Sequence, residues 1–270
     1  EDYDLRCTSL QYQKPNLIKC KECNLIFSEL LNIKFEKLYG DVIDEKYIQS
    51  IDFKKEYFEN TFKKIKKYIN ETNEVLEIGS YYGVFGSIIN SHVKKYTGIE
   101  LSSHAVEFAK KKYSLNVENK SINQYLQNIE KLDVVIMSHV IEHLDKPFEN
   151  ILDVRDKMSE KSVLIFSTYN MDSLVAKVLG KHYHWIMPMH KFYFTKLFLK
   201  KFMEQNGLEL VETITDTHTT SLKYFFTKIK AIVPIFKFIF EPLSNIKFFN
   251  KIFIKINLGD LDLYIVKKKY

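Results

Sequence analysis

Short apolar runs alternate with amphipathic segments over residues 71–215. Apolar runs of a few residues that end in turn-forming residues are typical of buried strands, and apolar residues repeating every three to four positions are typical of helices. We therefore predict strands at 75–78, 96–100, 115–118, 132–137, 162–167 and 208–214. Helices are predicted from about 84, over 103–113, near 122–128, over 146–158 and over 195–206, where Gly207 supplies a C-cap.

This alternation predicts a doubly wound α/β sheet of the Rossmann-like kind, with helices on both faces. Asp262–Val266 predicts one further strand near the end of the chain. Residues 41–70 have helical periodicity and many lysines, and predict a linker helix or a pair of helices. Residues 1–40 contain all three cysteines, so the chain divides into 1–40, 41–70 and a main domain over 71–270.

The composition suits one large α/β domain with a small appendage. The chain has 270 residues, of which 46% are hydrophobic, enough for a substantial core. No apolar run approaches the ~20 residues that span a bilayer. The charged N-terminus lacks a secretory pattern, and three cysteines do not make a disulfide framework. We therefore expect a cytoplasmic protein.

The positive charge is concentrated in one segment. The chain has a formal net charge of +6, and residues 223–257 contain seven lysines against one glutamate. Bulky apolar residues are interleaved with these lysines, which predicts a basic amphipathic insertion over 216–257. Two interpretations stay open: a helix pair on a membrane surface, at the inner face of the membrane, or a lid over a substrate pocket. Nucleic acid is not expected as a partner, because the charges alternate with apolar rather than polar groups.

A glycine turn marks the strongest candidate site. Residues 75–86 are Val-Leu-Glu-Ile-Gly-Ser-Tyr-Tyr-Gly-Val-Phe-Gly, which predicts a strand, a tight turn and a helix. Gly79 and Gly83 let the backbone turn and approach a ligand closely. Glu100 ends the next strand, where a carboxylate accepts two hydrogen bonds from a ribose diol. The pattern predicts an adenosine-containing ligand.

The spacing of the glycines argues against a dinucleotide. A pyrophosphate-binding turn needs G-x-G-x-x-G, whereas Tyr81 stands in the place of the second glycine here. Glu77, two residues before Gly79, repels a pyrophosphate but attracts an ammonium group. A nicotinamide-dependent Rossmann oxidoreductase or epimerase is therefore the weaker alternative.

These residues resemble motif I of the class I S-adenosylmethionine-dependent methyltransferases (E/D-x-G-x-G-x-G), and Glu100 matches their ribose-binding acid. Residues 132–144 look like the fourth strand and following loop of the small-molecule branch, and 190–195 resemble its H-x-x-x-F-S/T segment. The resemblance covers roughly residues 70–215 and the last strand. It implies a seven-stranded sheet whose last strand runs antiparallel beside strand six.

The resemblance also implies where S-adenosylmethionine binds. Glu77 and the turn from Gly79 to Gly83 would hold the methionine end, with the side chain of Tyr81 covering the ligand or narrowing the pocket. The other residues expected at the donor are Glu100 and Leu101 at the ribose, Ser121 and Ile122 at the adenine, and Ser138 and His139 after strand four.

Histidines are the candidates for catalysis. An imidazole suits removal of a proton from a hydroxyl, and His190 and His143 fit the family segments best. For the loop His139–His143, one interpretation is a general base or a divalent-metal clamp, since a related quinone-methylating group uses a similar E-x-x-E-H loop for a metal. The other is that Glu142 and His143 brace the loop while His139 lines the donor pocket. We favour bracing, because such loops occur in members with many substrates.

The acceptor is predicted only as a class. No N/D-P-P-Y/F turn follows the fourth strand, which argues against DNA or amide acceptors. The expected acceptor is a hydroxyl of a sugar, a glycan precursor, a lipid-linked intermediate or another small molecule. A non-catalytic binding module that keeps the fold is the second alternative, since Tyr81 departs from the family pattern.

The cysteines predict a separate structural feature. Cys20-x-x-Cys23 has the spacing of a zinc knuckle, Cys7 lies thirteen residues upstream, and Asp4 offers a carboxylate. The following Asn24–Phe27 resembles the ribbon that opens many members of this methyltransferase branch. Either a structural zinc or a metal-free relic of a zinc ribbon fits the pattern.

Overall fold

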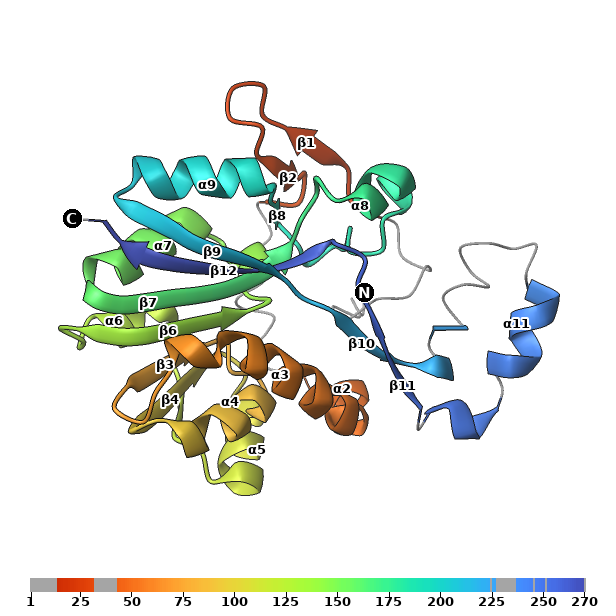
Figure 1. Cartoon of the computed structure of the whole chain (residues 1–270), viewed down its shortest axis with the longest axis horizontal. Coiled ribbons are helices and arrows are strands. Elements are labelled where there is room, and N and C mark those ends of the chain that lie inside the picture. The colour runs from red at the N-terminus through yellow and green to blue at the C-terminus, as the bar shows by residue number, and fades with distance from the viewer. Residues whose placement is uncertain are drawn as a thin grey trace.

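A seven-stranded mixed sheet forms the centre of the molecule (Figure 1). The computed structural model describes residues 14–31, 43–223, 225–226, 237–244, 246–250 and 252–269. The strand order is β5-β4-β3-β6-β7-β12-β9, and β12 runs antiparallel between β7 and β9. The strands are β3 (Glu74–Ile78), β4 (Lys95–Glu100), β5 (Val117–Asn119), β6 (Leu132–Ser138), β7 (Met158–Tyr169), β9 (Leu208–Thr215) and β12 (Leu261–Lys268). This confirms the predicted Rossmann-like sheet with its antiparallel last strand.

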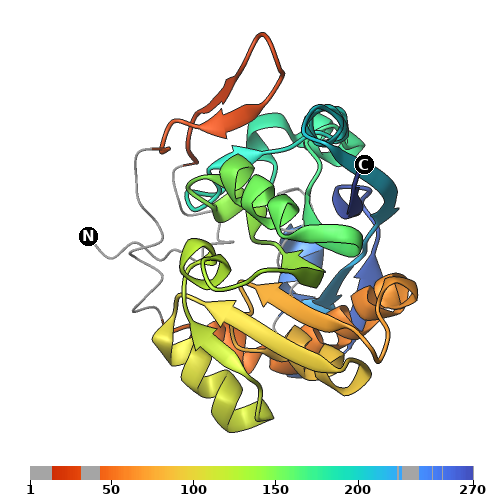
Figure 2. The ribbon, with the colours of Figure 1, turned by 90° about the vertical axis from the view of Figure 1, so that its left-hand side faces the viewer.

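Helices cover both faces of the sheet (Figure 2). One face carries α3 (Ile51–Ile65), α4 (Val84–Ile89) and α5 (Ser103–Tyr113), and the other α6 (Ile122–Leu126), α7 (Pro147–Asp156) and α9 (Lys196–Gln205). Because side chains alternate along a strand, Val163 and Ile165 of β7 pack against the first set, while Leu164 and Phe166 pack against the second. The central strands are therefore apolar on both faces, as parallel strands require.

Side-chain caps fix where several helices begin. Ser102 accepts a hydrogen bond from the backbone N–H of Ala105 at the start of α5. Ser121 and Gln124 form a reciprocal capping box at the start of α6. Each of these helices follows the carboxyl end of a parallel strand, so the loops that start them lie at one edge of the sheet.

Short elements outside the main sheet complete the fold, and none of them was predicted except α2, which lies in the segment predicted to form a linker helix or a pair of helices. β1 (Leu17–Lys19), β2 (Ile26–Ser28) and β8 (Phe192–Tyr193) form a separate three-stranded sheet. The remaining elements are α2 (Glu45–Gln49), η1 (Lys66–Tyr68), η2 (Asn90–His92), η3 (Ile141–His143), α8 (Leu174–Leu179) and η4 (Gly180–His182). Strands of two or three residues are too short to show a period in the sequence.

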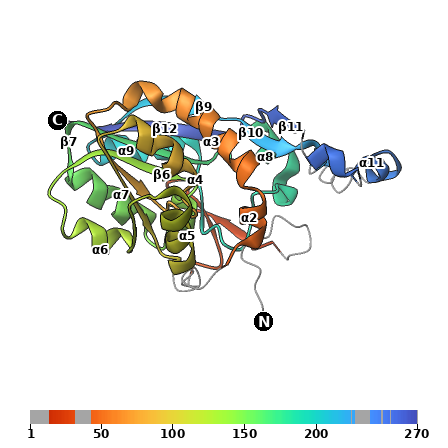
Figure 3. The same cartoon turned by 90° about the horizontal axis from the view of Figure 1, so that it is seen from below.

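The insertion before the last strand is only partly helical. β10 (His218–Ser221) and β11 (Phe253–Ile256) pair as an antiparallel ladder at its base, with α11 (Lys237–Ser244) and η6 (Lys247–Asn250) between them. The expectation of a helix pair is therefore wrong for both ends of the segment, where the ladder packs on α3 through the rings of Phe53 and Phe253. Figure 3 shows α11 extending away from the main sheet. In the described residues, no helix is long and apolar enough to cross a membrane.

Gly83 is required by both its backbone and its neighbours. It has φ 74°, and a Cβ there would lie 2.7 Å from Cβ of Ala109 and 2.9 Å from Cδ1 of Leu115. Gly83→Ala should destabilise the protein by about 2–4 kcal/mol, from left-handed strain plus overpacking. Gly207 has a similar φ of 68° but nothing within 4 Å, so Gly207→Ala should cost only about 1 kcal/mol. Equal midpoint shifts of the two variants in urea unfolding would contradict this packing role.

Candidate active site

One cavity of about 960 Å³ lies at the carboxyl ends of β3, β4 and β6. Its lining includes every predicted donor and catalytic residue except Gly83, which lies behind the turn. These residues are Glu77, Gly79, Tyr81, Glu100, Leu101, Ser121, Ile122, Ser138, His139, His143 and His190. The cavity thus brings together residues from two distant parts of the sequence.

The turn after β3 has an unusual backbone at Tyr81. Gly79, Tyr81 and Gly83 all have positive φ, at 71°, 47° and 74°. A tyrosine in this left-handed region carries a cost of about 1–2 kcal/mol that a glycine avoids. The turn compensates with contacts: Tyr81 donates its backbone N–H to Oε2 of Glu100 at 3.0 Å and its hydroxyl to Oδ2 of Asp44 at 2.9 Å. Tyr81 therefore adopts the left-handed backbone that a glycine adopts easily, and it adds a side chain at the cavity wall.

Glu100 is held rigidly at the end of β4. Its carboxylate accepts backbone N–H groups of Tyr81, Leu101 and Ser102 at 2.8–3.0 Å. Burial raises the pKa of Glu100, and these three donors oppose the shift. Oε1 accepts two of these hydrogen bonds and Oε2 accepts one, so Oε2 can still accept from a ligand hydroxyl.

Glu77 is buried beneath the same turn. The hydroxyl of Tyr96 donates to its Oε2 at 2.5 Å. Burial raises the pKa of Glu77 to about 8, with the Tyr96 hydrogen bond acting in the opposite direction. Near neutral pH the free protein therefore holds this side chain mainly as the carboxylic acid.

Donor binding should release a proton from Glu77. An ammonium group beside the carboxyl favours the ionised form, so at pH 7 a group with pKa about 8 should release about 0.9 proton. Donor affinity should correspondingly rise with pH up to about 8, because only the carboxylate attracts the ammonium. Calorimetry in buffers of different ionisation enthalpy measures the release. Glu77→Gln should abolish it, and a buffer-independent enthalpy for the native protein would contradict the assignment.

Three histidines lie around the cavity as neutral imidazoles. Burial lowers the pKa of His139 to about 3 and of His143 to about 4, and holds the pKa of His190 well below its usual value. Nδ1 of His190 lies 2.9 Å from the carbonyl oxygen of Trp185, and Nδ1 of His143 lies 3.2 Å from that of Met189. Carbonyl oxygens only accept, so both rings carry their proton on Nδ1 and a lone pair on Nε2.

Two loops position these histidines. Their backbones are joined by the N–H of Lys191 donating to the carbonyl of Glu142 at 2.8 Å, and Lys191 also pairs with Asp145. The rings of His143 and His190 consequently lie 4.6 Å apart, edge to face. Glu142 and His143 lie on the 3-10 turn η3, and His139 lies two residues before this turn.

Several cavity residues were missed by the sequence reasoning. Asp44, Tyr47, Lys54 and Tyr57 reach the cavity from α2, its N-cap and α3, which were interpreted only as linker. The helical period of this segment showed which face of α3 packs against the protein. No local sequence pattern, however, showed that α3 passes the ends of the strands that line the cavity. His218 and Thr219 enter from β10, at the base of the insertion, for the same reason.

The cysteines lie apart from the cavity. Cys20 and Cys23 are free thiols at the turn between β1 and β2, and Cys23 is exposed. Backbone N–H groups of Cys23 and Glu22 lower the pKa of Cys20, as suits a thiolate ligand. Cys7 and Asp4 lie outside the described residues. The structural zinc stays a prediction.

Comparisons with known proteins agree with this geometry. A family model described as a methyltransferase domain matches residues 51–213. A ubiquinone biosynthesis O-methyltransferase from Actinobacillus pleuropneumoniae is 25% identical over 122 residues, or 41% of this chain. The match spans about half the length of that curated relative, at 52%.

Solved structures share the fold. A SAM-dependent methyltransferase from Archaeoglobus fulgidus has a TM-score of 0.55 and 21% identity, over 84% of this chain and 100% of that chain. Magnesium protoporphyrin IX methyltransferase from Synechocystis, solved with bound SAH, has a TM-score of 0.51 and 14% identity, over 87% of this chain and 93% of that one. The family match covers more than half of the chain, and the predicted donor-site residues other than Gly83 line one cavity. The chain therefore belongs to the class I S-adenosylmethionine-dependent methyltransferases.

Proposed function

We propose that this protein transfers the methyl group of S-adenosylmethionine to a hydroxyl of a small molecule. The observation that carries the proposal is the position of His143 and His190, whose neutral imidazoles line the same cavity as Glu77 and Glu100. A neutral imidazole can take a proton from a hydroxyl as its oxygen becomes nucleophilic.

The transfer itself needs little from the protein beyond positioning. The acceptor oxygen attacks the sulfonium methyl in line, the carbon–sulfur bond breaks, and the electron pair of that bond leaves with S-adenosylhomocysteine. The acceptor proton passes to Nε2 of His190 or of His143. Lys191 and the two carbonyl oxygens at Nδ1 hold these rings in place, which supports a role in orientation.

The cavity wall favours an acceptor with a flat or apolar face. Tyr169 and Trp185 stack with ring centroids 4.1 Å apart beside the histidines. Such a surface packs against a sugar ring, a phenol or a lipid-linked precursor alike. The curated relative named for O-methylation supports oxygen as the accepting atom.

Two measurements test the proposal. Calorimetric titration with S-adenosylhomocysteine should show binding, and NAD should give none. Labelled methyl donor should then transfer its methyl group to a pool of hydroxylated sugars, phenols or polyprenyl-linked glycans, to give a product stable to base, as an ether is. Donor binding without transfer to any hydroxyl pool would favour the non-catalytic binding module, and transfer to amines would overturn oxygen as the acceptor.

We also propose that the insertion contacts an anionic membrane surface that carries the acceptor. Phe238 of α11 is 88% exposed and Phe248 of η6 is 64% exposed, within the segment that contains the excess of lysines. Apolar residues with basic neighbours bind a membrane surface by burial and by charge together. The base of the segment reaches the cavity through His218 and Thr219.

The protein should accordingly bind anionic liposomes, with affinity falling steeply as salt rises, since charges are screened within ~10 Å at 0.1 M. A Phe238→Ser/Phe248→Ser variant should lose most of this binding and keep its affinity for S-adenosylhomocysteine. Leu197→Ser, which changes an exposed leucine on α9, is the matched control and should bind as the native protein does. Equal sedimentation of all three proteins with liposomes would exclude the contact.

A further inference from the structure

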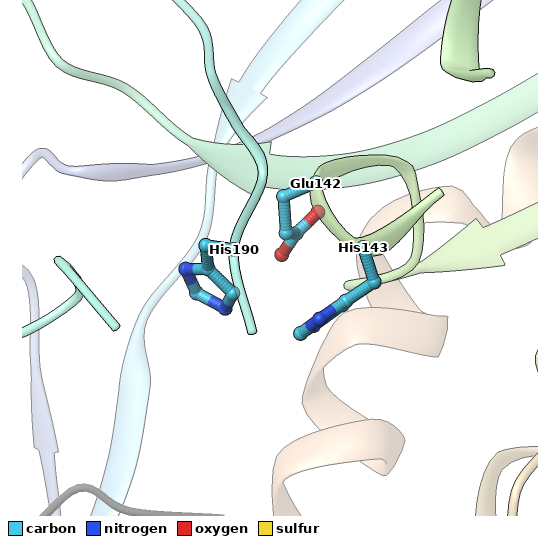
Figure 4. A group of neighbouring side chains, drawn as sticks. All are labelled: Glu142, His143 and His190. Atoms are coloured by element: carbon cyan, nitrogen blue, oxygen red, sulfur yellow. The ribbon is translucent and has the colours of Figure 1, made fainter. Parts of the chain in front are cut away.

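Glu142, His143 and His190 converge at the cavity from two separate loops (Figure 4). Each offers one potential metal-ligand atom, and these three atoms lie within 4.8 Å of one another. Glu142 and His143 belong to η3, and His190 lies two residues before β8. The sequence separates the first pair from His190 by nearly fifty residues, so only the fold assembles this cluster.

The backbone around the two histidines gives each ring the form that binds a metal. Both Nδ1 atoms lie within hydrogen-bond distance of a carbonyl oxygen, so the Nε2 atoms carry the lone pairs. A metal-binding histidine in proteins usually donates its second ring nitrogen in this way, which fixes both tautomer and orientation. The hydrogen bonds that usually hold metal-binding histidines in place are therefore already formed at His143 and His190.

The carboxylate of Glu142 is only half satisfied. The residue is 1% exposed, and Oε2 accepts a hydrogen bond from Thr168 at 3.1 Å. Among the described residues, Oε1 has no hydrogen-bond donor. A buried carboxylate oxygen without a donor is costly unless a cation or a proton lies beside it.

His139 supplies no donor to that oxygen. Tyr57 donates its single hydroxyl proton to Asp216 at 3.1 Å, so it accepts from Nε2 of His139, which lies 2.9 Å away. The lone pair of His139 is then on Nδ1, which lies 3.8 Å from Oε1 of Glu142. Two electron-rich atoms thus approach each other with no described donor between them.

We propose that Glu142, His143 and His190 bind one divalent transition-metal ion, of the kind that zinc, cobalt(II) or manganese(II) represents. Two imidazoles and one carboxylate suit such ions, whereas magnesium and calcium prefer oxygen ligands alone. A tetrahedral ion with ligands at about 2.1 Å places the ligand atoms about 3.4 Å apart, so small side-chain rotations close the site. Three protein ligands leave a position open to the cavity.

The site changes the role of the histidines in the proposed reaction. An acceptor hydroxyl bound at the open position would lose its proton more easily, so His143 and His190 would act as metal ligands rather than as proton acceptors. The proton would pass to the lone pair on Nδ1 of His139, which lines the same cavity. The metal site itself rests on the three side chains and is independent of which acceptor is used.

Metal binding by the isolated protein tests the inference without any turnover. The Cys20→Ser/Cys23→Ser variant of the full chain is used as background, so that thiol-bound metal does not contribute. After removal of metal with a chelator, titration with cobalt(II) or zinc should show one equivalent bound with a dissociation constant of about 10 µM or tighter. The visible spectrum of bound cobalt(II) reports the ligand environment.

Glu142→Gln and His190→Ala should each weaken metal binding by more than about 100-fold. This loss exceeds the one expected for a residue that only hydrogen-bonds to a metal ligand. His182→Ala removes an exposed histidine of η4 and should bind metal as the background does. Binding of S-adenosylhomocysteine by each variant shows that it is folded. Absence of binding at about 0.1 mM metal, or equal binding by the Glu142→Gln variant, would overturn the site. Either result leaves the methyl-transfer proposal standing, because that proposal is tested by donor binding and product formation.

Discussion

Glu100→Ala should weaken S-adenosylmethionine binding by about 30- to 200-fold. A carboxylate that receives both hydroxyls of a ribose contributes about 2–3 kcal/mol through charge-assisted hydrogen bonds. The structure adds a second reason, since the same carboxylate accepts the backbone N–H groups of Tyr81, Leu101 and Ser102. Loss of Glu100 therefore also releases the turn that is expected to hold the methionine end. Calorimetry with S-adenosylhomocysteine measures the effect.

Glu74→Ala is the control for this experiment. Glu74 begins β3 at the opposite end of the strand, is exposed, and pairs with Lys94. An exposed ion pair contributes about 0–1 kcal/mol, so this variant should bind the donor with native affinity. An unchanged dissociation constant for Glu100→Ala, in protein of native melting temperature, would remove Glu100 from the donor site.

His190→Ala should lower kcat by about 100- to 10,000-fold while the donor dissociation constant stays near its native value. The ring is buried at the cavity, its Nδ1 proton is directed to Trp185, and its Nε2 lone pair remains for chemistry. The loss is expected whether this lone pair takes the acceptor's proton or binds a metal that activates the acceptor. The expected donor contacts come from the ends of β3 and β4 and the start of α6, so they should be unaffected.

The control variant also removes one imidazole, but from a position outside the cavity. His182 is exposed and does not line the cavity, so His182→Ala should retain kcat within about twofold, as surface substitutions usually do. If His190→Ala changed KM for the acceptor but not kcat, His190 would be a binding group only. A native kcat in both variants would exclude it from the reaction.

Tyr81 departs from the glycine motif in sequence but keeps the positive φ that a glycine would allow. The second glycine of the motif is replaced, yet φ at Tyr81 is still 47° and its N–H still reaches Glu100. The hydroxyl bonds to Asp44, the N-cap of α2, so the side chain ties the N-terminal helices to the donor turn. The compensation depends on a residue 37 positions away, which the local sequence does not reveal.

The sequence by itself determined the sheet and its helices, and it predicted the donor half of the site. Short apolar runs predicted strand positions close to those observed, because a strand that is buried on both faces of the sheet is apolar at nearly every position. Gly79, Glu77 and Glu100 could be predicted as donor-site residues because they lie at strand ends, where position along the chain fixes position in space.

Only the tertiary structure decided how His190, His143 and Glu142 come together. His190 meets Glu142 because the backbone of Lys191 pairs with that residue across the gap between two loops, a contact with no local pattern. Tyr57 and Lys54 reach the cavity because α3 packs beside α4 and crosses the sheet there. The unsatisfied Oε1 of Glu142 arises from burial among these converging segments, and burial of a charge is a property of the assembled fold. Local periodicity thus specifies the helices and strands and where they end. A cluster of side chains from separate loops depends instead on long-range packing.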